Sequence, residues 1–409
     1  MKTPGLFDKS GKPVRRIVTE DGTETDAPKI LIVGGVAGGA TAAARLRRLN
    51  EYAEIIVFER TGYVSYANCG LPYYVGGVIG NKRALTLQSP AGFAARYNVE
   101  VRVGTEVISV DPAAHTVKAR ELATGREYTE DYDRLLLAPG ARAVLPDIPG
   151  IHGKHVHTLR TVEDTLRLAE HASRTGVKRA VVVGGGFIGL EAAENFIHRN
   201  IDVILLQRGR QVLPPLDEDM AVMLAEELVG NGVDVRFGAH VTEIRGSASG
   251  AEVITQAGSY PADIVLLSTG VMPESDLALA CGIETGIKGA IVTDEFMNTS
   301  DPDIFAVGDV AQTDDLVTES AVNVPLAGPA NRQARVAADN ICGKPDRYRG
   351  TQGTSVIKLF GLTAASTGLN EKTAKKAGVR YLKTITLSPS HATYYPGAEE
   401  MFIKLLFTP

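Results

Sequence analysis

The chain has 409 residues, of which 44% are hydrophobic and 22% charged, and 43 Lys and Arg against 48 Asp and Glu leave a net charge of −5. This length predicts two or three domains, and the nearly balanced charge argues against nucleic acid and anionic membranes as partners. The sequence shows neither an apolar run long enough to span a membrane nor a signal peptide. Its three cysteines are too few and too scattered for a disulfide framework or a metal site, so we expect a soluble cytoplasmic protein.

The first 28 residues lack apolar periodicity and predict a flexible N-terminal arm. Short β-branched runs then alternate with helical patterns, first in KILIVG, ATAAARLRRL and EIIVFE and later in RAVVVG, LEAAENFI and DVILLQ. Each set is a βαβ unit that opens with a glycine cluster. Two such units predict an α/β fold with two doubly wound, Rossmann-like domains, and hence two bound dinucleotides.

The first glycine cluster follows a strand and opens a helix, where backbone N–H groups and the helix dipole can bind a pyrophosphate. Its glycines are Gly34, Gly35, Gly38 and Gly39. Glu59 closes the next strand, where a carboxylate would bind a ribose hydroxyl. Val36 replaces the middle glycine of the usual pattern, and an ordinary strand-to-helix turn is the alternative. The flanking strand, the helix and Glu59 favour a nucleotide site.

The second cluster matches the full glycine pattern through Gly184, Gly186 and Gly189. Gln207 takes the place of the ribose-binding carboxylate. Arg208, with Arg210 beside it, could bind the 2′-phosphate of NADPH, whereas two solvated arginines beside an NADH site are the alternative. The choice between NADPH and NADH stays open.

Segments rich in Pro and Gly at residues 138–151 and around Gly270 mark crossings between domains. After residue 344 the pattern changes to strands and one basic helix, which predicts a smaller third domain. The chain stops in MFIKLLFTP, an apolar strand without a following partner. We therefore expect the third domain to be partial and the chain to be C-terminally truncated.

Cys69 lies in the segment SYANCGLPYY, ten residues after Glu59. A thiol beside a dinucleotide fold is typical of a redox centre, whereas a buried, inert thiol is the alternative. In dithiol reductases such as glutathione reductase a second cysteine lies nearby, but here the corresponding positions are Val64 and Tyr74. Only single-cysteine chemistry is therefore expected. The attacking species would be the thiolate, whose pKa a nearby flavin or a helix N-terminus would lower.

Four segments, GGVAGG, ANCGLPYY, PLAGPANRQ and HATYYPG, resemble those of coenzyme A disulfide reductases. These enzymes are a single-cysteine branch of the FAD- and NAD(P)-dependent pyridine nucleotide-disulfide oxidoreductases, and the resemblance covers residues 29–409. NADH peroxidases and water-forming NADH oxidases are similar as well. They carry a histidine where this chain has Ala37, which weakens the oxygen and peroxide alternatives.

The resemblance implies that Asp309, at the end of TSDPDIFAVGD, binds the ribityl chain of FAD. The first glycine cluster then binds FAD and the second binds NADPH or NADH. We expect an FAD-binding domain at residues 29–150 and 268–344, with an NAD(P)H-binding domain inserted at residues 151–267. A partial α+β dimerisation domain at residues 345–409 follows.

Thr41, Arg45 and Arg48 share one face of the first predicted helix, and such a face can bind phosphate. A solvated basic face is the alternative. The resemblance implies that these residues contact coenzyme A, together with Ser65, Asn68 and Asn331. It also implies a homodimer in which a tyrosine reaches Cys69 from the other subunit. Tyr394 and Tyr395 fit that catalytic role, because a phenol could protonate a leaving thiolate.

The resemblance therefore implies an FAD-dependent NAD(P)H oxidoreductase that reduces coenzyme A disulfide, or a coenzyme A persulfide or polysulfide, through a mixed disulfide at Cys69. One alternative is an NADH oxidase or peroxidase. The other is a flavoprotein that passes electrons to a rubredoxin- or ferredoxin-type partner, for which Cys69 would be irrelevant.

Overall fold

The structure is a computed structural model that describes residues 16–18 and 24–408. Most of the expected N-terminal arm lies outside the described residues. Of that arm, two short segments form antiparallel strands, β1 (Arg16–Val18) and β2 (Glu24–Asp26).

The first parallel sheet has five strands in the order β21-β9-β3-β4-β5. Its strands are β3 (Lys29–Val33), β4 (Glu54–Glu59), β5 (Glu100–Val103), β9 (Arg134–Leu137) and β21 (Ile304–Ala306). All four strand pairs are parallel, which fits the continuous apolar runs of strands that are buried on both faces. The sheet therefore unites two parts of the chain that lie far apart in the sequence.

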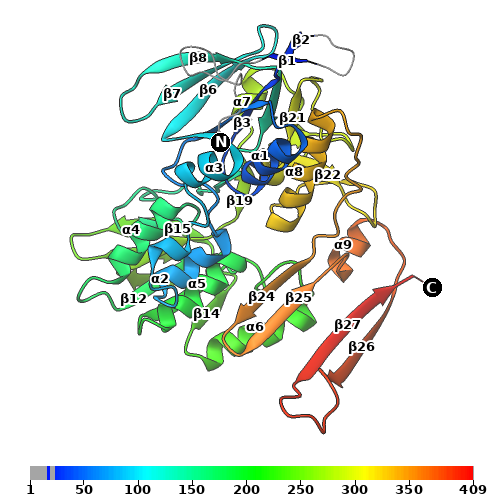
Figure 1. Cartoon of the computed structure of the whole chain (residues 1–409). Helices are drawn as coiled ribbons and strands as arrows, with labels where there is room; N and C mark the ends of the chain where they lie inside the picture. Colours follow the sequence, from blue (N-terminus) through cyan, green and yellow to red (C-terminus); the bar gives the residue numbers. More distant parts are fainter. Residues whose placement is uncertain (1–15, 19–23, 409) are drawn as a thin grey trace.

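Different layers cover the two faces of this sheet (Figure 1). Ile30 and Ile32 pack with the helices α1 (Ala37–Leu49) and α8 (Ala327–Ile341). On the other face, Leu31 and Val33 pack with a three-stranded antiparallel sheet. That sheet consists of β6 (Thr105–Asp111), β7 (Thr116–Glu121) and β8 (Glu127–Asp131).

The second parallel sheet has the order β11-β18-β12-β13-β14. Its strands are β11 (Val156–His157), β12 (Arg179–Val183), β13 (Asp202–Gln207), β14 (Asp234–Phe237) and β18 (Ile264–Leu267). Its helices are α4 (Val162–Ala172), α5 (Phe187–Ile197) and α6 (Glu218–Gly230). The antiparallel strands β15 (Val241–Gly246), β16 (Ala251–Thr255) and β17 (Gly258–Ala262) cover the opposite face.

The two crossings between the sheets lie side by side, because β10 (Ala141–Ala143) pairs antiparallel with β19 (Val271–Pro273). The second sheet is therefore inserted in the chain between β9 and β21. This topology confirms the predicted α/β fold class with one Rossmann-like unit inserted in another.

The C-terminal part is a set of hairpins at the lower right of Figure 1. It contains β24 (Ser355–Leu359), β25 (Leu362–Ser366), α9 (Glu371–Lys376), β26 (Leu382–Pro389) and β27 (Glu400–Phe407). Lys404 of β27 is nearly buried, and its Nζ lies 2.5 Å from Glu371, 2.7 Å from Asp219 and 3.1 Å from Asp217. One ammonium group thus ties the hairpin to the start of α6.

Shorter elements complete the described chain. They are α2 (Leu71–Val75), α3 (Pro90–Tyr97), α7 (Asp276–Ala280), β20 (Ile291–Val292), β22 (Ala311–Asp314) and β23 (Ala321–Val322), with 3-10 turns at Asn68–Gly70, Lys82–Ala84, Ile287–Gly289 and Gly308–Val310. Among the described residues, every helix is too short or too polar to cross a membrane.

Candidate active site

The two glycine clusters fold into nearly identical loops. A Cβ atom on Gly39 would lie 1.8 Å from the Gly34 carbonyl oxygen, and a Cβ atom on Gly189 would lie 2.0 Å from that of Gly184. Gly34 and Gly184 both have left-handed φ angles, of +96° and +108°. Only glycine fits these positions, because each helix must begin directly against the end of its strand. Both loops therefore present free backbone to a ligand in the way that dinucleotide-binding loops do.

The residue at the end of the second strand closes each loop in the same way. Glu59 Oε2 accepts a 2.8 Å hydrogen bond from the Gly35 N–H, and Gln207 Oε1 accepts a 2.9 Å bond from the Gly185 N–H. Glu59 also accepts a bond from the N–H of Thr61. Glu59 and Gln207, which the sequence places at equivalent positions, thus make the same hydrogen bond in their two loops. These loops fit FAD and NAD(P)H as their dinucleotides.

The arginines after Gln207 are free to meet a ligand. Arg208 and Arg210 are exposed, and neither has an ion-pair partner among the described residues. They could bind the 2′-phosphate of NADPH, and they could equally remain solvated beside a bound NADH.

Asp309 lies, mostly buried, between the two Rossmann-like units. Its Oδ2 lies 2.5 Å from Nη2 of Arg160, whose Nε also donates to the Ala141 carbonyl. The neighbouring Gly308 N–H donates to the side chain of Gln333 on α8. The aspartate is therefore fixed where β21 ends, at the edge where the carboxyl ends of parallel strands bind ligands. Arg160 is a partner that the sequence did not indicate.

Cys69 lies on a segment that runs from the first glycine loop to the core of the second unit. The Ser65 N–H donates to the Gly35 carbonyl at 2.8 Å, so this segment starts against the first loop. Ser65 has a left-handed φ of +47°, which is uncommon outside glycine and clusters at functional sites. After Cys69, Leu71 and Val75 of α2 are buried in the core of the second unit, where α5 also packs. The exposed thiol therefore lies at the junction of both units.

Carboxylates from α5 control the charge around Cys69. Although the side chain is exposed, partial desolvation by the surrounding residues and the Glu191 carboxylate raise the pKa of the Cys69 thiol. Burial and Glu194 in turn raise the pKa of Glu191 to about 7. The expectation that a flavin or a helix N-terminus lowers the pKa of this thiol stays a prediction, because the side chains described around Cys69 shift its pKa upward. Tyr73 adds a phenol whose pKa burial and Glu191 also raise.

The residues expected to contact coenzyme A fall into two groups. Thr41 on α1 donates to Oδ1 of Asn331 on α8 at 2.6 Å, and Arg45 forms a bidentate ion pair with Asp339. Arg48 is exposed. Thr41, Arg45 and Asn331 therefore line the junction of α1 and α8, where Asp339 already neutralises much of the charge of Arg45.

Ser65 and Asn68 form the second group, beside Cys69. Asn68 Oδ1 is buried and has no hydrogen-bond partner among the described residues. A buried amide oxygen without a partner is costly and is common where a ligand supplies the missing donor. This acceptor is available to a donor of a ligand bound next to Cys69.

Tyr394 and Tyr395 lie far from Cys69 within the chain. They occupy the loop between β26 and β27, with exposed fractions of 90% and 67%. Figure 1 shows this hairpin on the opposite side of the C-terminal part from α2. The proposed contact with Cys69 across a dimer stays a prediction.

The comparisons with known proteins agree with this geometry. Residues 28–334 match the model of the pyridine nucleotide-disulphide oxidoreductases. The chain is 36% identical to a CoA-dependent NAD(P)H sulfur oxidoreductase of Pyrococcus abyssi and 32% identical to a coenzyme A disulfide reductase of Staphylococcus epidermidis. These alignments cover 92% and 93% of the chain, and 83% and 85% of the relatives.

A solved structure, the reduced Bacillus anthracis CoADR-RHD, superimposes with a TM-score of 0.91 at 43% identity. It covers 94% of this chain, which in turn covers 69% of that protein. The fold and the paired glycine loops define a two-dinucleotide flavoprotein reductase. The chain belongs to the pyridine nucleotide-disulphide oxidoreductase family, and the predicted family membership is confirmed.

Proposed function

We propose that this protein is an FAD-dependent NAD(P)H oxidoreductase that reduces coenzyme A disulfide, or a coenzyme A persulfide or polysulfide, through Cys69. The observation that carries the proposal is the course of residues 65–75, which run with one exposed thiol from the first glycine loop to the core of the second unit. The names of the similar Pyrococcus and Staphylococcus proteins support the same substrate class.

The proposed domain roles follow from the topology. The sheet that contains β3 and β21 belongs to an FAD-binding domain at residues 29–150 and 268–344, and the inserted sheet belongs to an NAD(P)H-binding domain at residues 151–267. Residues 345–409 would form the dimerisation domain. When bound, the two dinucleotides supply the electron pair that returns the oxidised Cys69 to its thiolate.

The chain's own residues perform the sulfur chemistry. The Cys69 thiolate attacks one sulfur of coenzyme A disulfide, the S–S bond of the substrate breaks, and a Cys69–coenzyme A disulfide forms as one coenzyme A thiolate leaves. Glu191, which is half-protonated near neutral pH, is suited to hold the proton that Cys69 gives up. When the electron pair breaks the Cys69–coenzyme A disulfide, Cys69 returns to its thiolate and the second coenzyme A leaves as a thiolate, and each released coenzyme A thiolate takes up one proton.

The substrate would be held at its two ends. Asn68, with its unpartnered amide oxygen, and Ser65 would orient the thiol end beside Cys69. Thr41, Arg45 and the exposed Arg48 on α1, together with Asn331, would bind the nucleotide end, where coenzyme A carries its phosphates. Because Arg45 is paired with Asp339, a phosphate would share the Arg45 guanidinium with the Asp339 carboxylate.

We also infer a cytoplasmic homodimer. All three cysteines are free, as is usual in a reducing compartment. The hairpin β26–β27 exposes apolar side chains along both strands, among them Leu387 and Leu405, and large exposed apolar surfaces mark interaction sites. Tyr394 or Tyr395 would then meet Cys69 of the other subunit.

Replacing Cys69 by Ser tests the proposed function. The C69S protein should bind FAD normally and lose coenzyme A disulfide reduction with NADH or NADPH. Cys281→Ser is the matched control, because Cys281 packs beside the first sheet, away from both loops, and should stay active. Retained reduction by C69S would instead favour the electron-carrier alternative, in which a rubredoxin or ferredoxin accepts the electrons.

A further inference from the structure

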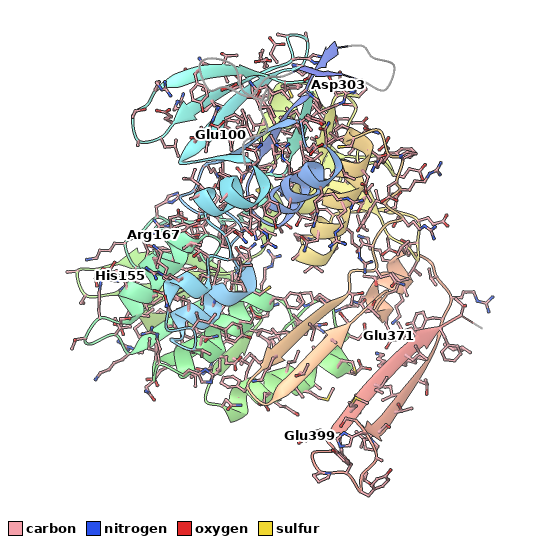
Figure 2. The ribbon with its side chains drawn as sticks, viewed as in Figure 1. Glu100, His155, Arg167, Asp303, Glu371 and Glu399 are labelled. Atoms are coloured by element: carbon pink, nitrogen blue, oxygen red, sulfur yellow. The ribbon has the colours of Figure 1, made fainter. Side chains whose placement is uncertain are left out.

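We infer that the second glycine loop selects NADPH over NADH, and that Arg208 and Arg210 bind the 2′-phosphate of its adenosine. The inference rests on the proposed function, because it names the reductant of the same enzyme. β13 and β14 end side by side, since Gln207 pairs in register with Phe237. These two strands form one end of the second sheet, and β11, next to His155 in Figure 2, forms the other. Folds of this kind bind the adenosine of a dinucleotide at the carboxyl end of the second strand of the βαβ unit.

The side chain at the ribose position is a neutral amide that the protein already holds. Oε1 of Gln207 accepts the 2.9 Å bond from the Gly185 N–H, and Nε2 donates to the Gln211 carbonyl at 2.9 Å. In the first loop Glu59 makes the corresponding bond with a carboxylate. A carboxylate at this position binds the 2′-hydroxyl of NADH and repels a 2′-phosphate, whereas an amide carries no charge that repels it. The second loop therefore lacks the group that would exclude NADPH.

Two unpaired guanidinium groups follow this amide. Arg208 and Arg210 are exposed, and neither forms an ion pair within the described part of the chain. Neither residues 207–216 nor residues 237–242, which begin at the ends of β13 and β14, contain an Asp or Glu. An incoming phosphate therefore meets two free cations and no carboxylate from these segments. Guanidinium groups bind phosphate through paired, charge-assisted hydrogen bonds.

The backbone that carries the two arginines is fixed to the neighbouring strand. The Ala239 N–H donates to the Gln207 carbonyl at 3.1 Å, and the Gly238 N–H donates to the Gly209 carbonyl at 3.3 Å. Phe237 has an exposed fraction of 43% at this edge. Because paired residues of neighbouring strands point to the same face, its ring lies on the face of the Gln207 amide and can stack on adenine. The edge thus offers an aromatic surface for the base beside cations for the phosphate.

Solvated arginines beside an NADH site are the alternative. Selection for NADH requires an element that disfavours the 2′-phosphate, which is ordinarily a carboxylate at the ribose position. Gln207 does not supply it, whereas charge-assisted contacts from Arg208 and Arg210 would favour NADPH by about ten- to hundredfold. The balance of charge at the strand ends therefore favours the phosphorylated dinucleotide.

Binding of NADP⁺ and NAD⁺ to the FAD-containing full chain tests this inference, because these two ligands differ only in the 2′-phosphate. Isothermal titration calorimetry should give a Kd for NADP⁺ at least about tenfold below that for NAD⁺. The double variant Arg208→Gln and Arg210→Gln should lose most of this difference and leave the affinity for NAD⁺ unchanged. Raising the salt concentration should weaken the binding of NADP⁺ more than that of NAD⁺. Gln207→Asp should reverse the preference, because it places a carboxylate at the ribose position.

The control is Arg179→Gln, which removes an exposed arginine at the start of β12 and should leave both affinities unchanged, because it lies at the amino ends of the same parallel strands. Equal affinities for the two ligands, or a preference for NADP⁺ that survives the double variant, would overturn the inference. The absence of NADP⁺ binding at about 1 mM would overturn it as well. The titration requires neither Cys69 nor coenzyme A, so disulfide reduction that is retained in the Cys69→Ser protein would count against the proposed function alone.

Discussion

Arg160 binds Asp309 across the boundary between the two Rossmann-like units, with 2.5 Å between Nη2 and Oδ2. The aspartate lies in the 3-10 turn that follows β21 of the first sheet, and the arginine precedes α4 of the second unit. Both side chains are mostly buried, with exposed fractions of 15% and 24%. This ion pair therefore couples the position of the expected flavin anchor to the position of the inserted unit.

Arg160→Gln should lower the free energy of unfolding by about 1–3 kcal/mol, because it leaves the mostly buried Asp309 carboxylate without its partner. It should also loosen the binding of FAD. Chemical denaturation and the flavin-to-protein ratio measure the two effects. Arg174→Gln is the control, since it breaks an exposed pair with Glu170 and should cost less than about 1 kcal/mol. Equal losses in both variants would contradict a special role for Arg160.

Gly39→Ala should abolish FAD binding, because the new methyl group would lie 1.8 Å from a backbone oxygen that cannot move away without opening the loop. The flavin content of the purified protein is the measurement. Gly230→Ala serves as the matched helix variant, since a Cβ atom on Gly230 would meet no other atom within 4 Å, and it should retain FAD. A flavin-replete G39A protein would show that the first loop does not hold the cofactor.

Glu191→Gln should make the Cys69 thiol react faster with iodoacetamide at pH 7–8, by several-fold, because it removes a carboxylate that opposes the thiolate. Glu226→Gln, an exposed change on α6, should leave the rate unaltered. Alkylation rates measured on the reduced protein against pH decide the matter. An unchanged rate in E191Q would mean that Glu191 does not control the thiol.

The same substitution predicts a change in the pH dependence of stability. The pKa of Glu191 is raised in the folded protein from 4.5 to about 7, so the folded state holds a proton that the unfolded state has lost between these values. Stability should therefore fall as the pH rises from 4.5 toward 7, and Glu191→Gln should remove this fall, which amounts to about 2–3 kcal/mol. Unfolding of both proteins at pH 5 and pH 8 measures it. If the stability of both proteins changed equally between pH 5 and pH 8, the raised pKa of Glu191 would be contradicted.

Lys404→Met should free the β26–β27 hairpin from α6 and α9. It leaves the Asp217 carboxylate without its ammonium partner and Glu371 with Lys383 alone, which should cost about 1–3 kcal/mol. Amide hydrogen exchange across residues 382–389 and 400–407 should become faster while the two parallel sheets stay protected. Lys376→Met, an exposed change in α9, should not alter exchange. Unchanged protection of the hairpin in K404M would show that other contacts hold it.

Local patterns were enough to predict the geometry of the two glycine loops. A strand, a glycine turn and a helix follow one another along the chain, so Gly34, Gly39 and Glu59 could be assigned from the sequence alone. The same holds for Gly184 and Gln207, and the parallel sheets confirmed the fold class.

Contacts between distant segments could not be predicted in this way. Arg45 pairs with Asp339, 294 residues away. This ion pair reduces the positive charge of the α1 face, which the residue spacing alone predicts to be basic. The charge at Cys69 depends on α5 packing next to α2, and the raised thiol pKa that results is not indicated by the local sequence. Arg160 was missed for the same reason, because no sequence signal links it to Asp309.

The mass of the Cys69 peptide after exposure to coenzyme A disulfide tests the proposed role of this thiol most directly. Reduced protein should be mixed with the disulfide, digested without reductant and compared with C69S. We predict one coenzyme A attached to the peptide that contains Cys69, released by a reductant or by NAD(P)H in the FAD-containing enzyme. An unmodified Cys69 in a protein that still reduces coenzyme A disulfide would contradict this role.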